Sequence, residues 1–309
     1  MTTDTDIQVH GGRLVARALR GHGVTKLFTL SGGHLFSIYD GCRSEGIEIV
    51  DVRHEQAAAF AAEGWAKVTR TPGVCALTAG PGVTNGMSAM ASAAANHSPM
   101  LVLGGRAPAF RWGQGSLQEI DHVPFVAPVV KFAATAGTTA EIPALLDEAL
   151  RVALTPHSGP VFVDFPLDQV FSEAQEGELA AALPEPWSGA GADGGEVERA
   201  AALLRAAERP VIMAGTDLYW GHGEEQLRAL AHELRVPVFL NGLGRGCLPA
   251  DDELFYSRAR SAGLGQADVA LVIGVPIDFR LGFGTAFSVE AEVIVVDVAA
   301  PERPHPRPV

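Results

Sequence analysis

Short apolar runs rich in β-branched and aromatic residues alternate with alanine-rich stretches along almost the whole chain. Runs such as residues 74–78 and 161–165 suit strands that are buried on both faces, and residues 55–68 suit a helix. Alternation of strands and helices predicts parallel sheets covered by helices. We therefore expect an α/β fold with two doubly wound, mainly parallel sheet domains that carry helices on both faces.

The alternation occurs in two series separated by one polar stretch. We expect strands at residues 26–30, 47–51, 74–78, 100–103, 161–165, 211–214, 236–240, 269–273 and 293–296. We expect helices at residues 11–22, 35–44, 55–68, 83–95, 140–154, 196–207 and 224–234. The stretch 173–195 is rich in glycine and proline and predicts a linker. The predicted organisation is a domain at 1–172, a linker at 173–195 and a second domain at 196–309.

Composition excludes several classes of partner. The 309 residues carry a formal net charge of −13, which disfavours attraction to nucleic acid or to an anionic membrane. No apolar run approaches the ~20 residues of a membrane span, and the polar N-terminus lacks a signal-peptide core. The three cysteines show neither metal-ligand spacing nor a disulfide framework. We expect a cytoplasmic protein that binds no nucleic acid or membrane and forms no metal site by itself.

A carboxylate and two glycine-containing turns follow three of the predicted strands. Glu55 follows the strand at 47–51 and begins a helix, where a negative charge is stabilising in itself. Glycine turns follow the strands at 26–30 and 74–78, and each leads into a helix. Each turn alone also fits a structural role. Because parallel strands end at one edge of a sheet, where open α/β folds bind ligands, the three turns together predict one ligand site.

The segments Arg53-His54-Glu55-Gln56 and Gly80-Pro81-Gly82-x-x-Asn85, in this order and spacing, resemble those of thiamine-diphosphate-dependent enzymes related to acetolactate synthase. The resemblance covers nearly the whole chain and implies a pyrimidine-binding domain followed by the central domain of that family. It implies that Glu55 is catalytic and hydrogen-bonds N1′ of the aminopyrimidine, which promotes ylide formation on the thiazolium. The cofactor-binding residues that it implies are Ser31, Gly32, Gly33, Gly80, Pro81, Gly82 and Asn85, with Ser31 standing where the family usually has proline.

Three further residues are candidates for the substrate side of the site. The resemblance implies that Gln118 faces the substrate, and Leu117 stands before it where phenylalanine is usual. His97 lies near a predicted strand end and could serve in proton transfer or in packing, with a structural hydrogen bond favoured.

The second domain leaves its ligand open. The resemblance implies FAD, as in acetolactate synthases, or the ADP part of CoA, as in related CoA-thioester lyases and decarboxylases. Gly215 follows a predicted strand, and Arg258, Arg260 and Arg280 could bind phosphates bidentately. Exposed arginines on an acidic protein are an equally good explanation.

The chain lacks the Gly-Asp-Gly sequence with which this family holds the cofactor's diphosphate through Mg²⁺. We expect a diphosphate-binding domain in a partner chain or a missing C-terminal part, and hence a homo- or hetero-oligomer with a shared site. The expected function is a carboligase that decarboxylates a 2-keto acid and transfers the two-carbon unit to an acceptor carbonyl. The alternatives are a 2-hydroxyacyl-CoA lyase or CoA-thioester decarboxylase, and a non-catalytic regulatory or scaffold subunit.

Overall fold

The computed structural model describes residues 8–175, 191–301 and 303–309. The chain divides into two compact units, Met1–Glu185 (unit 1) and Pro186–Val309 (unit 2). Most of the predicted linker, residues 176–190, lies outside the described residues. Its described ends are ordered elements: Glu173–Gln175 is strand β8, and helix α8 begins at Gly194. The polar composition concealed β8 because its backbone partners come from a distant strand. Helix α8, predicted at 196–207, begins two residues earlier because the Asp193 carboxylate caps it.

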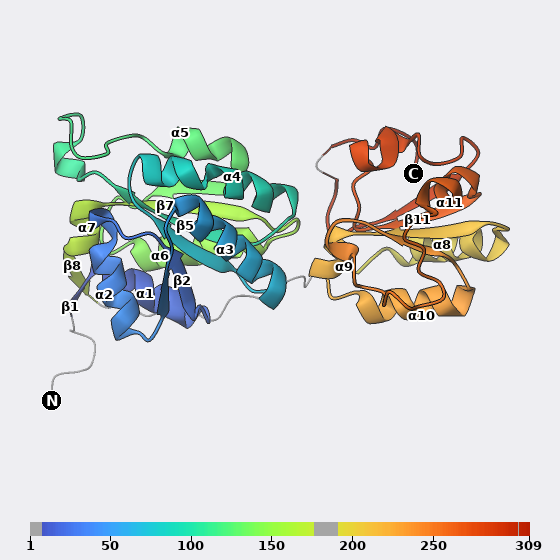
Figure 1. Cartoon of the computed structure of the whole chain (residues 1–309), viewed down its shortest axis with the longest axis horizontal. Coiled ribbons are helices and arrows are strands. Elements are labelled where there is room, and N and C mark those ends of the chain that lie inside the picture. The colour runs from blue at the N-terminus through green and yellow to red at the C-terminus, as the bar shows by residue number, and fades with distance from the viewer. Residues whose placement is uncertain (1–7, 176–190, 302) are drawn as a thin grey trace. The chain divides into compact units, whose positions relative to one another are not determined.

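Unit 1 is built on a six-stranded sheet whose strand order is β3-β2-β4-β5-β7-β6, and every neighbouring pair is parallel (Figure 1). The strands are β2 (Lys26–Thr29), β3 (Glu48–Asp51), β4 (Gly73–Leu77), β5 (Met100–Arg106), β6 (Phe132–Thr135) and β7 (Pro160–Pro166). One face is covered by α1 (Gly11–Gly21), α2 (Phe36–Ser44), α6 (Ile142–Leu154) and α7 (Leu167–Phe171). The other face is covered by α3 (Glu55–Thr69), α4 (Pro81–Ala95) and α5 (Val123–Val126).

The strand residues of unit 1 divide between two cores. In β4, Val74 and Ala76 belong to the core under α1 and α6, whereas Cys75 and Leu77 belong to the core under α3 and α4. This two-residue period is the geometry of a strand buried on both faces. It explains why such runs are continuously apolar, and it confirms the predicted α/β class.

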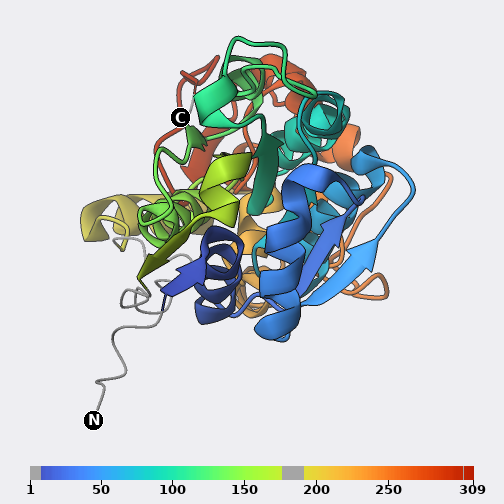
Figure 2. The same ribbon diagram turned by 90° about the vertical axis from the view of Figure 1, so that its left-hand side faces the viewer.

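Besides β8 and the short helices α5 and α7, two strands of unit 1 were not predicted from the sequence. Strand β6 has the sequence Phe-Ala-Ala-Thr and is only half-buried at the edge of the sheet, so its apolar signal is weak. Strand β1 (Gln8–His10) pairs antiparallel with β8, and Figure 2 shows these two short strands, dark blue and yellow-green, side by side. Pairs this short leave no periodic pattern to read.

Unit 2 repeats the architecture on a smaller scale. Its parallel sheet has the order β10-β9-β11-β12. The strands are β9 (Pro210–Ala214), β10 (Val238–Leu240), β11 (Val269–Ile273) and β12 (Glu292–Val296), and the helices are α8 (Gly194–Ala206), α9 (Thr216–Trp220), α10 (Glu224–Leu234) and α11 (Arg260–Gln266). Leu218 and Leu227 pack α9 and α10 on one face, and Leu264 packs α11 on the other. In the described part of the chain, no helix is both long and apolar enough to cross a membrane.

Candidate active site

The three turns predicted to form a site lie at one edge of the unit 1 sheet. They follow β3, β2 and β4, which are neighbours in that order, and all three strands end at the same edge because they are parallel. The turn after β2 contains Ser31, Gly32 and Gly33, the turn after β3 leads to Glu55, and the turn after β4 contains Gly80. The sequence prediction therefore brought together segments that the fold places side by side.

Glu55 is the first residue of α3 and is half-buried. The helix is capped by His54, whose Nδ1 accepts a hydrogen bond from the backbone N–H of Gln56 at 3.1 Å. Asn85, one turn into α4, donates from Nδ2 to Oε2 of Glu55 at 3.0 Å. Among the described residues, Asn85 is the one donor to this carboxylate. The carboxylate is thus held from one side, with its second oxygen, Oε1, pointing toward the glycine turn.

The turn at residues 80–82 requires glycine for two separate reasons. Gly80 has φ +60° and ψ −116°, a conformation that residues with a Cβ rarely adopt. At Gly82, a Cβ would lie 2.7 Å from Cγ2 of Thr78 and 3.6 Å from Oε1 of Glu55. Glycine at this position therefore lets the backbone of the turn pack against Thr78 and lie close to the Glu55 carboxylate. Pro81 then begins α4, where its fixed φ suits the first helical residue.

The turn after β2 packs on the turn after β4 through Thr78. A Cβ on Gly32 would lie 2.4 Å from the Thr78 side chain, so glycine allows the two turns to touch. Nδ1 of the buried His34 lies 3.2 Å from Thr78 Oγ1, and that hydroxyl also lies 3.5 Å from Oε1 of Gln118. Burial lowers the pKa of His34, against a smaller raising effect of its backbone hydrogen bond at Leu117. Thr78 links three segments, and it was not among the predicted residues.

The predicted substrate residues do not all lie at this edge. Gln118 has φ +55°, and its backbone oxygen would be 2.9 Å from a Cβ on Gly80, so it lies directly over the glycine turn. Leu117 beside it is 75% exposed and is available to a ligand or a partner. His97 requires correction. It precedes β5, at the opposite edge of the sheet, where its ring stacks on that of His157 with 4.8 Å between centroids. A strand has two ends, and the sequence prediction did not distinguish them.

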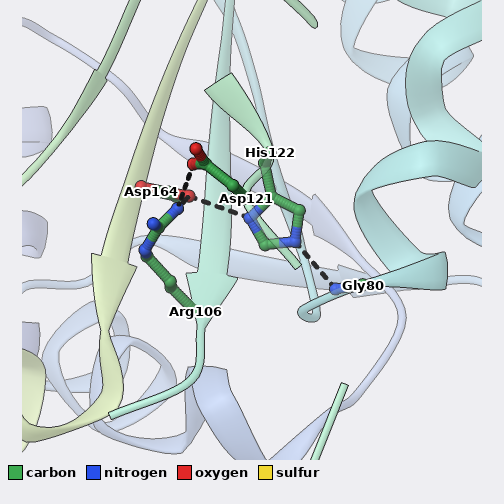
Figure 3. Close-up of polar contacts among 5 residues, drawn as sticks. All are labelled: Gly80, Arg106, Asp121, His122 and Asp164. Atoms are coloured by element: carbon green, nitrogen blue, oxygen red, sulfur yellow. Dashed lines mark hydrogen bonds and ion pairs between the residues drawn. The ribbon is translucent and has the colours of Figure 1, made fainter. Parts of the chain in front are cut away.

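Figure 3 shows a buried polar network behind the glycine turn that the sequence analysis missed. The backbone N–H of Gly80 donates to Nε2 of His122 at 2.8 Å, and Nδ1 of His122 lies 2.8 Å from Oδ2 of Asp164. Arg106 donates from Nη1 to Asp164 at 3.0 Å and to Asp121 at 3.1 Å. The side chains of His122 and Asp164 are fully buried. One signal pointed to it: Asp164 is a charged residue inside an otherwise apolar strand.

In unit 2, the four predicted nucleotide residues separate into different places. Arg258 and Arg260 line a cavity of about 680 Å³ together with Arg245, Tyr256 and Ser257. Gly215 follows β9 and does not line that cavity; a Cβ there would lie 2.6 Å from Oδ1 of Asn241.

Arg280 also requires correction as a phosphate ligand. Its guanidinium makes two-pronged hydrogen bonds to the Asp278 carboxylate, Nε at 3.0 Å and Nη2 at 2.6 Å. Burial raises the pKa of Asp278, but the hydrogen bonds from Arg280 outweigh it and leave this pKa below its usual range. The charge of Arg280 is therefore already matched two residues away, a local pairing that spacing alone did not predict.

Two family models match the chain, one within each unit. The model described as "Thiamine pyrophosphate enzyme, N-terminal TPP binding domain" matches residues 9–125, and the one described as "Thiamine pyrophosphate enzyme, central domain" matches residues 197–308. Together they cover well over half of the chain. The chain thus belongs to the thiamine pyrophosphate enzyme family. Its first unit is doubly wound, with a glutamate and glycine turns at the carboxyl edge of the sheet, and its second unit is a smaller α/β unit.

Within that family, the chain is similar to acetolactate synthases and to 2-hydroxyacyl-CoA lyases. It is 60% identical to the acetolactate synthase large subunit IlvG of Mycobacterium tuberculosis, over 100% of this chain and 57% of the relative. It is 35% identical to 2-hydroxyacyl-CoA lyase 2 of Bos taurus over 95% of this chain and 52% of the relative. It is 31% identical to the 2-hydroxyacyl-CoA lyase of Oryza sativa over 99% of this chain and 56% of the relative. The chain spans slightly more than half the length of these relatives.

Proposed function

We propose that this chain supplies the pyrimidine-binding half of a thiamine-diphosphate-dependent carboligase of acetolactate synthase type. The observation that carries the proposal is the Glu55–Asn85 hydrogen bond, which holds a carboxylate beside the glycine turn at Gly82. The 60% identity to the mycobacterial acetolactate synthase large subunit supports carboligation over lyase activity. The substrates would be a 2-keto acid and a second carbonyl compound that accepts the two-carbon unit.

The residues present fit the aminopyrimidine ring of this cofactor. Asn85 occupies Oε2 of Glu55, so Oε1 is left to accept a charge-assisted hydrogen bond from a protonated ring nitrogen, N1′. Gly82 carries no side chain beside that oxygen, which would let a flat ring approach edge-on. Thiamine diphosphate, when bound, supplies the carbon nucleophile and the electron sink for decarboxylation. Glu55 contributes by holding a proton at N1′, and Gln118 and Leu117 border the substrate side.

We propose that Mg²⁺ and the diphosphate are held outside this chain. The chain offers no Gly-Asp-Gly sequence, and its relatives extend well beyond the part that it matches. The diphosphate-binding domain would come from a partner chain or from a further C-terminal part, in a homo- or hetero-oligomer. The domain boundaries 1–172 and 196–309 and a cytoplasmic location remain predictions that this arrangement accommodates.

The test is replacement of Glu55 by glutamine in the complete assembly. We expect Glu55→Gln to lower kcat by about 10²–10⁴-fold, because only the proton interaction at N1′ is lost. Glu148→Gln, which removes the same charge from an exposed position of α6, is the control and should retain full turnover. Near-normal turnover of the Glu55 variant would contradict the assignment. Absence of turnover in the unmodified assembly with any 2-keto acid would favour the scaffold alternative.

A second proposal concerns the cavity of unit 2. Three arginines and three aromatic residues line it, which suits a nucleotide: FAD in a carboligase, or the ADP part of CoA in a 2-hydroxyacyl-CoA lyase. Titration calorimetry with FAD, ADP and CoA tests the choice. Arg258→Gln and Arg260→Gln should weaken binding about tenfold each by removing a charge-assisted hydrogen bond. Arg280→Gln, whose native guanidinium is paired with Asp278, should leave the affinity unchanged. No binding of any of the three ligands would refute the proposal.

A further inference from the structure

We infer that His122, with Asp164 and Arg106 behind it, is the positioning residue that fixes the glycine turn of the candidate site. The inference rests on the proposed function for the identity of the ligand, but its structural part concerns this chain alone. None of these three residues belongs to the turns that identified the site. They act on it through one backbone amide, that of Gly80.

The hydrogen bonds assign the tautomer of His122. Its Nε2 faces a backbone N–H, which can only donate, so Nε2 must present a lone pair. The ring hydrogen therefore resides on Nδ1, where it donates to the Asp164 carboxylate at 2.8 Å. Both ring nitrogens are engaged and the side chain is fully buried, so His122 cannot exchange protons with a ligand. It acts by position, and the Asp164 carboxylate selects its tautomer, as the aspartate of a Ser-His-Asp triad selects the tautomer of its histidine.

The Asp164 carboxylate anchors this network. Its Oδ2 accepts hydrogen bonds from His122 and Arg106, while its buried Oδ1 has no hydrogen-bond partner within the described residues. A buried carboxylate this sparsely bonded requires the guanidinium, because an uncompensated buried charge is strongly destabilising. Arg106 in turn lies 4.1 Å from the ring centroid of Trp112 and is only 12% exposed. The charge is therefore fixed by packing as well as by pairing.

The consequence is that two walls of the site are joined. His122 holds Gly80 in its positive-φ conformation, and the backbone of Gln118 lies directly on Gly80. Arg106 also binds Asp121, in the same segment as Gln118. The glycine turn beside Glu55 and the segment on the substrate side are thus held by one network. If the network is loosened, both should shift together, and the Glu55 carboxylate would keep its own hydrogen bond to Asn85.

Two variants separate the positioning role from general packing. In His122→Gln, the side-chain amide can reach the place of Nε2 and accept from Gly80. In His122→Asn, it reaches only the place of Nδ1 and serves Asp164 alone. We expect amide hydrogen exchange at Gly80 to be about tenfold faster in the Asn variant than in the wild type, and near wild-type in the Gln variant. In the complete assembly, the KM for thiamine diphosphate should rise about tenfold in the Asn variant alone, with kcat changed less.

The tautomer of His122 can be measured on the wild-type chain, so this test does not depend on the folding of a variant. Nitrogen-15 NMR of the histidine side chains should show His122 as the tautomer with hydrogen on Nδ1. A hydrogen on Nε2, or equal exchange at Gly80 in all three proteins, would overturn the inference. Faster exchange with an unchanged cofactor KM would refute the link to the ligand. An assembly that does not bind thiamine diphosphate would instead refute the proposed function and the ligand part of this inference, while the exchange and NMR results decide the positioning of Gly80.

Discussion

Replacement of Gly80 by alanine tests the geometry of the site most directly. Holding a residue that has a Cβ in a backbone conformation favoured only by glycine costs about 1–3 kcal/mol of folding stability. The new Cβ would also lie 2.9 Å from the backbone oxygen of Gln118, and that segment cannot easily retreat because Arg106 and His122 hold it. We expect Gly80→Ala to lower the free energy of unfolding by about 2–3 kcal/mol.

The control is Gly33→Ala in the neighbouring turn. A Cβ on Gly33 meets no atom within 4 Å, and its φ is not positive, so alanine should change stability by less than about 1 kcal/mol and is expected to stabilise. For a domain of this size, thermal unfolding should show a Tm about 4–12 °C lower in Gly80→Ala than in the wild type. Hydrogen exchange read by mass spectrometry on unit 1 peptides confines the comparison to that unit. If the free energies of unfolding of the two variants differ by less than about 0.5 kcal/mol, the inference that the turn at Gly80 requires glycine is refuted.

Three further predictions follow from single groups. Asn85→Ala should lower turnover of the assembly about tenfold with little loss of stability, because Asn85 is exposed and its bond to Glu55 is lost; unchanged kinetics would contradict this. Because burial lowers the pKa of His34 below 6.5, the unfolded state binds the extra proton, so stability is lost as the pH falls from about 6.5 toward the folded pKa. Urea titrations of His34→Gln should show a flatter loss over that window, and an equal slope would refute the assignment. Burial raises the pKa of Cys42 to about 12 and that of Cys75 further, so iodoacetamide should label these thiols only on unfolding, as mass spectrometry can verify.

The fold and the candidate site differ in how far the sequence predicts them. The buried strands of unit 1 were predictable because continuous apolar runs have one explanation in a two-faced sheet. Short or half-buried elements such as β1, β6 and α11 were missed, because a few residues of mixed polarity show no periodic pattern of hydrophobicity.

At the site, sequence order predicted which turns share an edge, but not which side chains face each other. Glu55 and Asn85 belong to helices that follow different strands, and their hydrogen bond depends on how α3 packs against α4. His122 and Asp164 are 42 residues apart, and their pairing follows from the strand order of the sheet, which the sequence does not display. His97 was misplaced because it precedes β5, and the amino ends of parallel strands lie at the edge opposite the turns that follow β2, β3 and β4.

The pairing of β1 with β8 has a consequence for the chain as a whole. The first and last strands described in unit 1 lie side by side, so the polypeptide enters and leaves this unit at neighbouring points. A unit closed in this way can be excised, inserted or circularly permuted with a short connection, and its parallel sheet need not be rearranged. The glutamate and glycine turns belong to strands internal to that closure. Unit 1 can therefore be transferred between polypeptides as a module without a change in the order of its strands.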